Sequence, residues 1–529
     1  MKILPLLLPL LFVLVSPVAA ESDGGAASEG KAVIPYEAGV GFEPLNAIDR
    51  CVLAELQQRG IEPSNPCSDA VFLRRVYVDV IGTLPDPWAV RHFLRNGAPD
   101  KRVKLIDELL EREEFVDYWT LKWGDVLRVK AEFPIKLWPN GVHTYHRWIR
   151  DAVKENLPYD EFARTLLTSS GSNFRVAPVN FYRAIQDRSA AGVAGAVALT
   201  FMGSRFDAWP EEKRAGMTPF FSRIVYKPTA EWKEEIIIAD PAPAGPLKAS
   251  FPDGRAVEIP GDVDPRRVFA DWLITPRNPY FTKSIANRVW FWLLGRGIVH
   301  EPDDFREDNP PSNPALLTCL ERELTESGYD LKHLFRFILS SRTYQGSSIP
   351  RSDDPAAEAL FAHYKVRRLD AEVLIDALCS LDGRGVEYMS IVPEPFTYLP
   401  NMTRSVKLKD GTITSPFLEK FGRPARDTGV ETERDNDPTD AQRLFLLNSS
   451  EIQRRLERSP WLRRLMRGGK RNRLGAIRPI YITLLSREPT PAELAYVASY
   501  FGEGGRNPRE ASVDLAWALI NSKEFLYRH

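Results

Sequence analysis

The chain has 529 residues, of which 43% are hydrophobic and 27% are charged, the balance of an ordinary globular protein. This length exceeds what one hydrophobic core commonly supports, so we expect two or three structural units of about 100–200 residues each. The 70 lysines and arginines are matched by 71 acidic residues. Because no charge excess exists, the composition gives no support for a nucleic-acid partner or for adsorption to an anionic membrane surface.

The first twenty residues have the pattern of a cleavable export signal. Lys2 supplies a positive charge, an apolar stretch with two prolines runs from Ile3 to Val15, and Val18-Ala19-Ala20 places small residues where a signal peptidase cuts. The apolar stretch is shorter than the ~20 residues of a membrane-spanning helix. The sequence therefore predicts a signal peptide over 1–20 and an exported protein of the periplasm or cell surface, with no membrane span in the mature chain.

Helical periodicity dominates the chain that follows. Residues 21–44 are small, polar and rich in glycine, so we expect a flexible leader there. Apolar residues then recur at intervals of three and four, which predicts an N-terminal helical domain over 45–220. Asp86-Pro87 is typical of a helix start, with an N-cap residue followed by proline. The expected helices cover residues 47–56, 68–82, 87–95, 100–113, 115–130, 142–154 and 159–168.

The pattern changes between residues 221 and 262. Short β-like runs lie here, separated by a proline-rich turn and by Asp253-Gly254. We predict a small antiparallel β insertion of three or four strands. A second helical domain, 263–529, follows and contains a long loop at about 381–440. The predicted fold class is therefore mainly α, with two helical domains bracketing a small antiparallel β insertion. The β-like runs are 223–226, 235–239, 247–251 and 256–259.

One motif occurs near both ends of the mature chain. Arg74-Arg75-Val76-Tyr77 resembles Arg478-Pro479-Ile480-Tyr481, and in both copies the tyrosine lies ten residues before a helix-opening proline. Each copy then continues to a Glu-Phe pair, at 114–115 and at 524–525. We expect the same helix–turn–helix packing unit near each end. Two copies do not make a solenoid.

The four cysteines are Cys51, Cys67, Cys319 and Cys379. An oxidising compartment permits disulfides, and Cys51 and Cys67 are close enough in sequence to be joined. Cys319 and Cys379 lie on apolar helical faces, where a buried small hydrophobic side chain is the simpler interpretation. No Cys-x-x-Cys occurs, which excludes a thioredoxin-like dithiol and a zinc knuckle.

The chain contains two sets of distinctive motifs. The first set is Asp49-Arg50, Leu73-Arg74-Arg75, Leu84-Pro85 and Trp119-x-x-Lys122-Trp123, and the second includes Asn287-Arg288-Val289-Trp290, Asp303-Asp304-Phe305, Asn309-Pro310-Pro311-Ser312, Phe421-Gly422-Arg423-Pro424 and Leu446-Leu447-Asn448. These sets resemble, in this order, the domains of unknown function DUF 1549 and DUF 1553, which are paired in exported proteins of planctomycete-type bacteria. The resemblance spans most of residues 45–528 and implies compartment and architecture rather than a reaction.

One feature of that family is missing. Many of its members carry Cys-x-x-Cys-His, the attachment motif of c-type haem, soon after the first helical set. The corresponding stretch here, 201–210, has neither the cysteines nor the histidine. We therefore expect no covalently bound haem, and the sequence predicts no other cofactor and no metal.

The strongest local candidate for a polar site is the apolar stretch 285–294 and the turn that follows it. Arg288 lies within this stretch, and burying an unpaired guanidinium would cost several kcal/mol, so it needs an acidic partner. Asp303 and Asp304 follow the helix stop and could fold back to it. The simpler interpretation is a buried Arg–Asp pair that fixes the loop, and the alternative is a pocket for a substrate hydroxyl or carboxylate. The candidate binding residues here are Asn287, Arg288, Arg296, Asp303 and Asp304.

A second candidate is the charged tract 422–437 in the long loop, where binding residues tend to concentrate. Its acidic residues alternate, a spacing that would suit a hard cation such as calcium. However, no glycine occupies the turn position of a calcium loop and Arg434 intrudes, so a solvated charge run is the simpler interpretation. The tract contributes Arg423, Arg426, Glu433 and Asp437 to the candidate binding residues.

Histidines and tryptophans give weaker candidates. His143 and His146 could face one metal, but no third ligand is evident nearby. Trp138 and Trp209 lie beside prolines in predicted turns, as does Trp88, so we expect exposed contacts there and count Trp138 and Trp209 among the binding residues. The tryptophans on helical stripes should instead belong to the core. These are Trp119, Trp123, Trp290 and Trp292.

The leading functional hypothesis is a non-redox binding or scaffold component of the periplasm or cell surface, with a polysaccharide or a cell-surface protein as its partner. The first alternative is a hydrolase of a polymeric substrate that uses Asp304 and Glu433. The second alternative is a docking partner of a separate haem protein. Convergence of Arg288, Asp303, Asp304, Arg423 and Glu433 in one open pocket would favour an enzyme, and dispersal into buried pairs would favour a scaffold.

Overall fold

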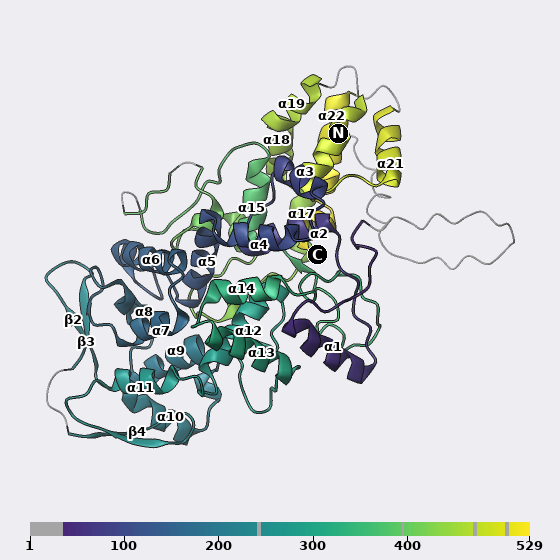
Figure 1. The fold of residues 1–529 in the computed structure, drawn as a ribbon. Coiled ribbons are helices and arrows are strands. Elements are labelled where there is room, and N and C mark those ends of the chain that lie inside the picture. Colours follow the sequence, from purple (N-terminus) through teal and green to yellow (C-terminus); the bar gives the residue numbers. More distant parts are fainter. Residues whose placement is uncertain (1–34, 241–244, 394–395, 401, 469–472, 503–506) are drawn as a thin grey trace.

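The computed structural model describes residues 35–240, 245–393, 396–400, 402–468, 473–502 and 507–529. The expected signal peptide and most of the expected leader lie outside these ranges. Within them the chain is predominantly α-helical with small antiparallel sheets, which confirms the predicted fold class (Figure 1). None of the helices in this part of the chain is long and apolar enough to span a bilayer.

Local sequence explains where the first helices begin. Asn46 accepts hydrogen bonds from the amides of Ile48 and Asp49 and forms a capping box with Asp49, and Asp86 caps the helix that Pro87 opens. The helices of this part are α1 (Ala47–Arg59), α2 (Asp69–Ile81), α3 (Pro87–Arg95), α4 (Lys101–Leu110), α5 (Glu113–Val126), α6 (Trp138–Lys154), α7 (Tyr159–Thr168), α8 (Asn180–Arg183), α9 (Ala190–Met202) and α10 (Glu211–Met217).

The predicted β insertion is present as two small antiparallel sheets. One has the order β1-β3-β2, because a short strand of the helical part pairs with the insertion, and the other is the hairpin β4-β5. They lie at one end of the molecule with α10 and α11 (Pro265–Leu273), opposite α19 (Pro460–Gly468) and α22 (Pro508–Ile520) (Figure 1). The strands are β1 (Gly171–Ser172), β2 (Ile224–Pro228), β3 (Glu235–Ala239), β4 (Leu247–Ser250) and β5 (Ala256–Ile259).

Helices resume after the insertion, and the long loop contains only short elements. These are the 3-10 turns η5 (Ser405–Lys407) and η6 (Glu431–Glu433) and the helix α16 (Pro416–Lys420). The other elements are α11 (Pro265–Leu273), α12 (Phe281–Leu294), α13 (Pro314–Glu326), α14 (Leu331–Leu339), β6 (Arg367–Arg368), α15 (Ala371–Ser380), α17 (Asp440–Asn448), α18 (Ser450–Arg458), α19 (Pro460–Gly468), α20 (Ile477–Leu485), α21 (Pro491–Gly502), α22 (Pro508–Ile520), α23 (Lys523–Leu526) and β7 (Tyr527–Arg528).

Apolar side chains from before and after the insertion form one continuous core. The ring of Trp119 on α5 lies 5.2 Å from that of Trp292 on α12 and 4.3 Å from that of Phe335 on α14. Trp123 and Trp290 are also buried, so the four tryptophans expected in the core are there. The division of the chain into domains at 45–220, 221–262 and 263–529 stays a prediction.

The two copies of the repeated motif adopt corresponding structures and contact each other. α2 and α20 both end on a residue with positive φ five positions after the tyrosine, Gly82 at 58° and Ser486 at 60°. Arg74 on α2 donates to the carbonyl of Leu484 at 2.8 Å and to that of Phe525 at 3.0 Å. The motif therefore marks a packing unit that joins α2 to the end of α20 and to Phe525.

Gly82 should not tolerate a side chain. A Cβ atom there would lie 2.6 Å from the Tyr118 ring, in addition to the cost of the left-handed conformation. We expect Gly82→Ala to lower the free energy of unfolding by roughly 2–4 kcal/mol. Gly60 ends α1 at a φ of 67°, and no atom lies within 4 Å of the place that a Cβ would take, so Gly60→Ala should cost only about 1–2 kcal/mol. Urea unfolding followed by circular dichroism measures both, and equal losses would contradict the packing argument.

Candidate functional site

Arg288 has the acidic partner that its sequence predicts. The guanidinium is 1% exposed and forms an ion pair with Asp303, and it also donates to the Thr200 carbonyl at 2.9 Å and to the Leu199 carbonyl at 3.3 Å. Each of these partners belongs to α9 or to the turn after α12. The pair therefore fastens α12 to α9 and fixes the loop that follows, as the structural interpretation predicts.

Glu431 of the long loop completes this cluster. Its amide donates to the second oxygen of Asp303 at 2.7 Å, and its carboxylate accepts from the Trp292 indole at 2.8 Å and lies 3.8 Å from the Arg288 Nε. Burial raises the pKa of the Glu431 carboxyl to about 7, although Arg288 opposes that rise. One guanidinium thus faces two carboxyl groups, and the loop is held against α12.

The other candidate residues near Arg288 lie in or contact the turn after α12. Asn287 is fully buried and exchanges two hydrogen bonds with the Val299 backbone, at 2.9 and 3.0 Å. Asp304 forms an ion pair with Arg306 at 2.9 Å near the surface. Arg296 is half-buried and lies close enough to His300 to lower its pKa, after the larger effect of burial. These residues do not converge with Arg288 on an open pocket.

The three arginines of the charged tract 422–437 point inward rather than toward solvent. Arg426 donates to Asp125 at 2.8 Å, and Arg434 bridges Asp125 at 2.6 Å and Glu372 at 2.7 Å. Arg423 is also buried, donates to the carbonyls of Ile413 and Asp410 and lies 3.4 Å from Glu372, and burial lowers its pKa to about 10. The expectation of a solvated charge run is therefore wrong for these arginines, because each one neutralises a buried carboxylate.

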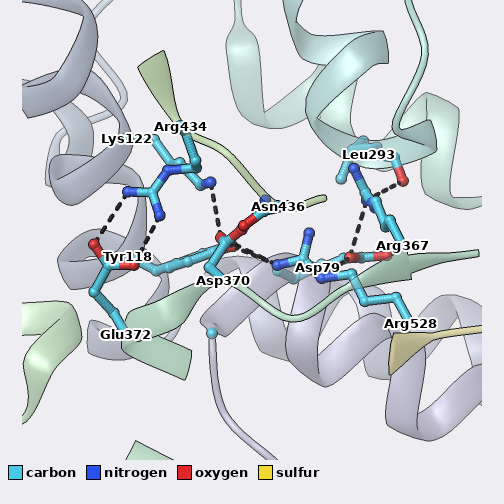
Figure 2. A network of polar contacts seen from close by, with 12 residues as sticks. Asp79, Tyr118, Lys122, Leu293, Arg367, Asp370, Glu372, Arg434, Asn436 and Arg528 are labelled. Atoms are coloured by element: carbon cyan, nitrogen blue, oxygen red, sulfur yellow. Dashed lines mark hydrogen bonds and ion pairs between the residues drawn. The ribbon is translucent and has the colours of Figure 1, made fainter. Parts of the chain in front are cut away.

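These pairs belong to a larger buried network (Figure 2). Asp370 at the start of α15 accepts from Lys122 at 2.8 Å, from Arg528 at 3.1 Å and from the Tyr118 hydroxyl at 2.6 Å. Burial alone would raise the pKa of Asp370, but Lys122, Arg528 and Arg434 hold it well below its usual range. The ionised carboxylate is therefore the stable form of Asp370 at neutral pH.

Asp79 on α2 is the second centre of this network. It accepts hydrogen bonds from the hydroxyls of Tyr344 at 2.9 Å and Tyr364 at 3.0 Å, and from Arg367 at 3.2 Å, while Arg528 lies 3.4 Å away. Arg528 thus links both carboxylates. The acids come from α2, α5 and the start of α15, and the bases come from α5, the long loop and the paired strands β6 and β7.

The alternating acids of the charged tract do not share a ligand. Glu431 faces Arg288, Glu433 accepts from the backbone amides of residues 427–429, and Asp435 accepts from the Asp437 amide at 2.9 Å. Asp437 itself is exposed. Among the described residues, no group of three or more His, Cys, Asp or Glu side chains is arranged to hold a metal ion.

His143 and His146 line a cavity of about 420 Å³ between α5, α6 and the turn after η5. Burial, followed by Arg426 and Lys409, lowers the pKa of His146 to about 3. The other residues that line the cavity are mostly cationic, including Arg147, Arg150 and Lys409. This environment keeps the imidazoles neutral. Asp117 and Asp151 also line the cavity, but among the described residues they do not join the histidines in a group arranged to hold a metal ion.

The tryptophans expected in turns differ in exposure. Trp88 is 69% exposed, as expected. Trp209 is only 7% exposed, because its indole donates to Ser204 at 2.8 Å and Lys213 covers its ring, so the expectation of an exposed contact is wrong there. Trp138 is half-buried, and its ring centroid lies 4.5 Å from that of Trp232 and 5.6 Å from that of Phe396.

Two members of this aromatic cluster were not foreseen. Trp232 lies in the hairpin turn between β2 and β3 and is 61% exposed, and Phe396 lies in the long loop and is 48% exposed. Trp138 was singled out by an adjacent proline, and Phe396 has the same signal because it follows Pro395. Trp232 has no adjacent proline, although it lies in a turn between two β-like runs. Only the fold brings the three segments together.

The cysteines form no disulfide: all four are free thiols. Cys67, considered as a partner of Cys51, is buried and pairs through its backbone with Glu37 and Gln345. Cys319 is buried on α13, as expected of a small hydrophobic residue, whereas Cys379 is half-buried.

Fold and network together define a mainly helical protein whose two helical parts are joined by buried ion pairs. Residues 47–200 match the family PSCyt2, described as a protein of unknown function (DUF1549), and residues 265–501 match PSD1, described as a protein of unknown function (DUF1553). The chain belongs to the proteins that carry these two domains. Comparisons with curated proteins and with solved structures find no match.

The network gives a prediction for Arg434. Arg434→Met would leave Glu372 and Asp125 short of a buried partner, so we expect it to lower the free energy of unfolding by about 3–5 kcal/mol. The control is Arg59→Met, which breaks the exposed pair of Arg59 with Glu55 and should cost less than about 1 kcal/mol. Urea unfolding of the two variants makes the comparison. A loss for Arg434→Met as small as that of the control would contradict a structural role for the network.

Proposed function

We propose that this chain is a non-redox binding or scaffold component of the periplasm or cell surface and that it binds a polysaccharide. The observation that carries the proposal is the aromatic cluster of Trp138, Trp232 and Phe396. Exposed apolar patches of this kind mark interaction sites on globular proteins. The compartment rests on the export pattern of residues 1–20.

The cluster has the chemistry that sugar rings need. Three separate segments contribute to it: the start of α6, the β2–β3 turn and the long loop. The exposed ring faces can stack against the apolar C–H face of a sugar while its hydroxyl groups stay in water. Lys233 lies 5.5 Å from the Trp232 ring centroid and adds a hydrogen-bond donor beside the platform.

The charged candidates support the scaffold part of the proposal. Arg288, Asp303 and Arg423 are engaged in buried contacts, which is the arrangement expected of a scaffold rather than of a pocket. For the hydrolase alternative, Asp304 is already paired with Arg306, and Glu433 accepts three backbone amides. These contacts favour a structural role for both carboxylates over the role of a general acid or base. Docking to a separate haem protein stays a hypothesis.

Affinity electrophoresis in gels that contain xyloglucan, hydroxyethylcellulose or laminarin tests the proposal. We expect at least one polysaccharide to retard the protein and Trp232→Ala to weaken that retardation about tenfold, since one stacked ring contributes about 1.4 kcal/mol. The matched control is Trp88→Ala, an exposed tryptophan on α3 that stacks on His92. No retardation in any gel, or equal effects of the two variants, would overturn the proposal.

A further inference from the structure

A cavity of about 520 Å³ lies where the two copies of the repeated motif meet. One side is the turn between α2 and α3, at residues 83–87, and the opposite side is the end of α20 with Phe525. The end of α15, residues 402–404 of the long loop and Trp461 on α19 close the remaining sides. Its volume falls within the range of small-molecule sites, about 300–1,000 Å³.

The walls of the cavity are largely apolar and firmly held. Leu84, Leu381, Trp461 and Leu484 contribute aliphatic and aromatic surface. Leu484 is fully buried, and its carbonyl and that of Phe525 are fixed by Arg74. A ligand would therefore meet a preformed surface, which lowers the entropic cost of binding.

The buried carboxylate of the cavity is already occupied. Asp376 accepts from the Ser405 amide at 2.7 Å, from the Val406 amide at 3.3 Å and from Arg404 Nε at 3.3 Å. Asp376 therefore has little capacity to receive a donor from a ligand. The exposed Asp86 caps α3 through one oxygen, which accepts from the amides of residues 88 and 89.

Donor groups, by contrast, remain available. Arg404 uses Nε for Asp376 and Nη2 for the Gly82 carbonyl at 3.2 Å, and its Nη1 has no partner among the described residues. Thr483 also lines the cavity, and its buried hydroxyl has no hydrogen-bond partner among the described residues. Arg384 is exposed and also lines the cavity. The free Nη1 of Arg404 and the Thr483 hydroxyl suit an acceptor group on a ligand, and the guanidinium favours an anionic acceptor, although Asp86 and Asp376 also line the cavity.

We propose that this cavity binds a small carboxylic acid, with its apolar body against Leu84, Trp461 and Leu484 and its carboxylate on Arg404. The proposal does not depend on the polysaccharide site, because no residue of the aromatic cluster lines the cavity. The repeated motif then has a consequence beyond packing, since the turn after α2 in one copy and the end of α20 in the other both line the binding site.

Cys379 allows the site to be tested in the unmodified protein. Its half-buried thiol lines the cavity, whereas Cys51, also half-buried, does not. Burial raises the pKa of the Cys379 thiol to about 12, so modification by methyl methanethiosulfonate should be slow enough to follow by peptide mass spectrometry. We expect octanoate to slow modification of Cys379 at least threefold and to leave the rate at Cys51 unchanged. Equal rates at Cys379 with and without octanoate would overturn the proposal.

Calorimetric titration with octanoate and octanol separates the polar contact from apolar burial. We expect Arg404→Gln to weaken octanoate binding about tenfold, the value of one charge-assisted hydrogen bond, and to leave octanol binding within twofold. Trp232→Ala should change neither affinity. Equal losses for octanoate and octanol in Arg404→Gln would contradict the placement of the carboxylate, and a loss in Trp232→Ala would place the binding at the aromatic cluster instead.

Discussion

The buried ion network around Asp370 and Asp79 is the constraint on which the rest of this structure depends. A charge removed from water needs an opposite charge and hydrogen bonds, otherwise it costs several kcal/mol. Here Asp125 on α5 pairs with Arg426 of the long loop, and Asp79 on α2 lies beside Arg528 on β7. In the other direction, Lys122 on α5 pairs with Asp370 at the start of α15. Each helical part of the chain therefore contains charges that only the other part neutralises.

This constraint explains why the long loop is ordered without regular secondary structure. Its few helical turns cannot by themselves form hydrogen bonds for the whole loop backbone or bury a hydrophobic core. Instead Arg423, Arg426 and Arg434 reach inward to buried carboxylates, and Glu431 closes over Arg288. Residues that would suit a binding loop by composition are consumed in holding the fold. Phe396 of this loop stays exposed beside the half-buried Trp138.

The sequence predicts the local features of this fold well. The helix start at Asp86, the hairpin at 247–259 and the partner of Arg288 follow from short-range patterns, and all are present. The network does not follow in this way, because Asp79 and Arg528 are separated by most of the chain and only the fold brings them together. The sequence of α2 does indicate that such a network is needed. Arg74, Arg75 and Asp79 interrupt an apolar helix and so require distant partners.

The same limit applies to the candidate sites. Prolines beside Trp209 suggest an exposed turn, but the sequence does not reveal that Ser204 and Lys213 enclose the indole. The sequence also does not predict the cavity between Leu84 and Leu484, although both residues lie in or beside the repeated motif. Repetition shows which segments are alike, whereas the contact between the copies depends on the hydrogen bonds that Arg74 makes.

Native-state hydrogen exchange in increasing urea tests most directly whether the two helical parts form one cooperative unit. If the network joins them, the slowest amides of α5 and α15 must report the same free energy of opening and the same dependence on urea. Opening of α2–α5 at a distinctly lower free energy, while α12 and α15 stay protected, would contradict this account.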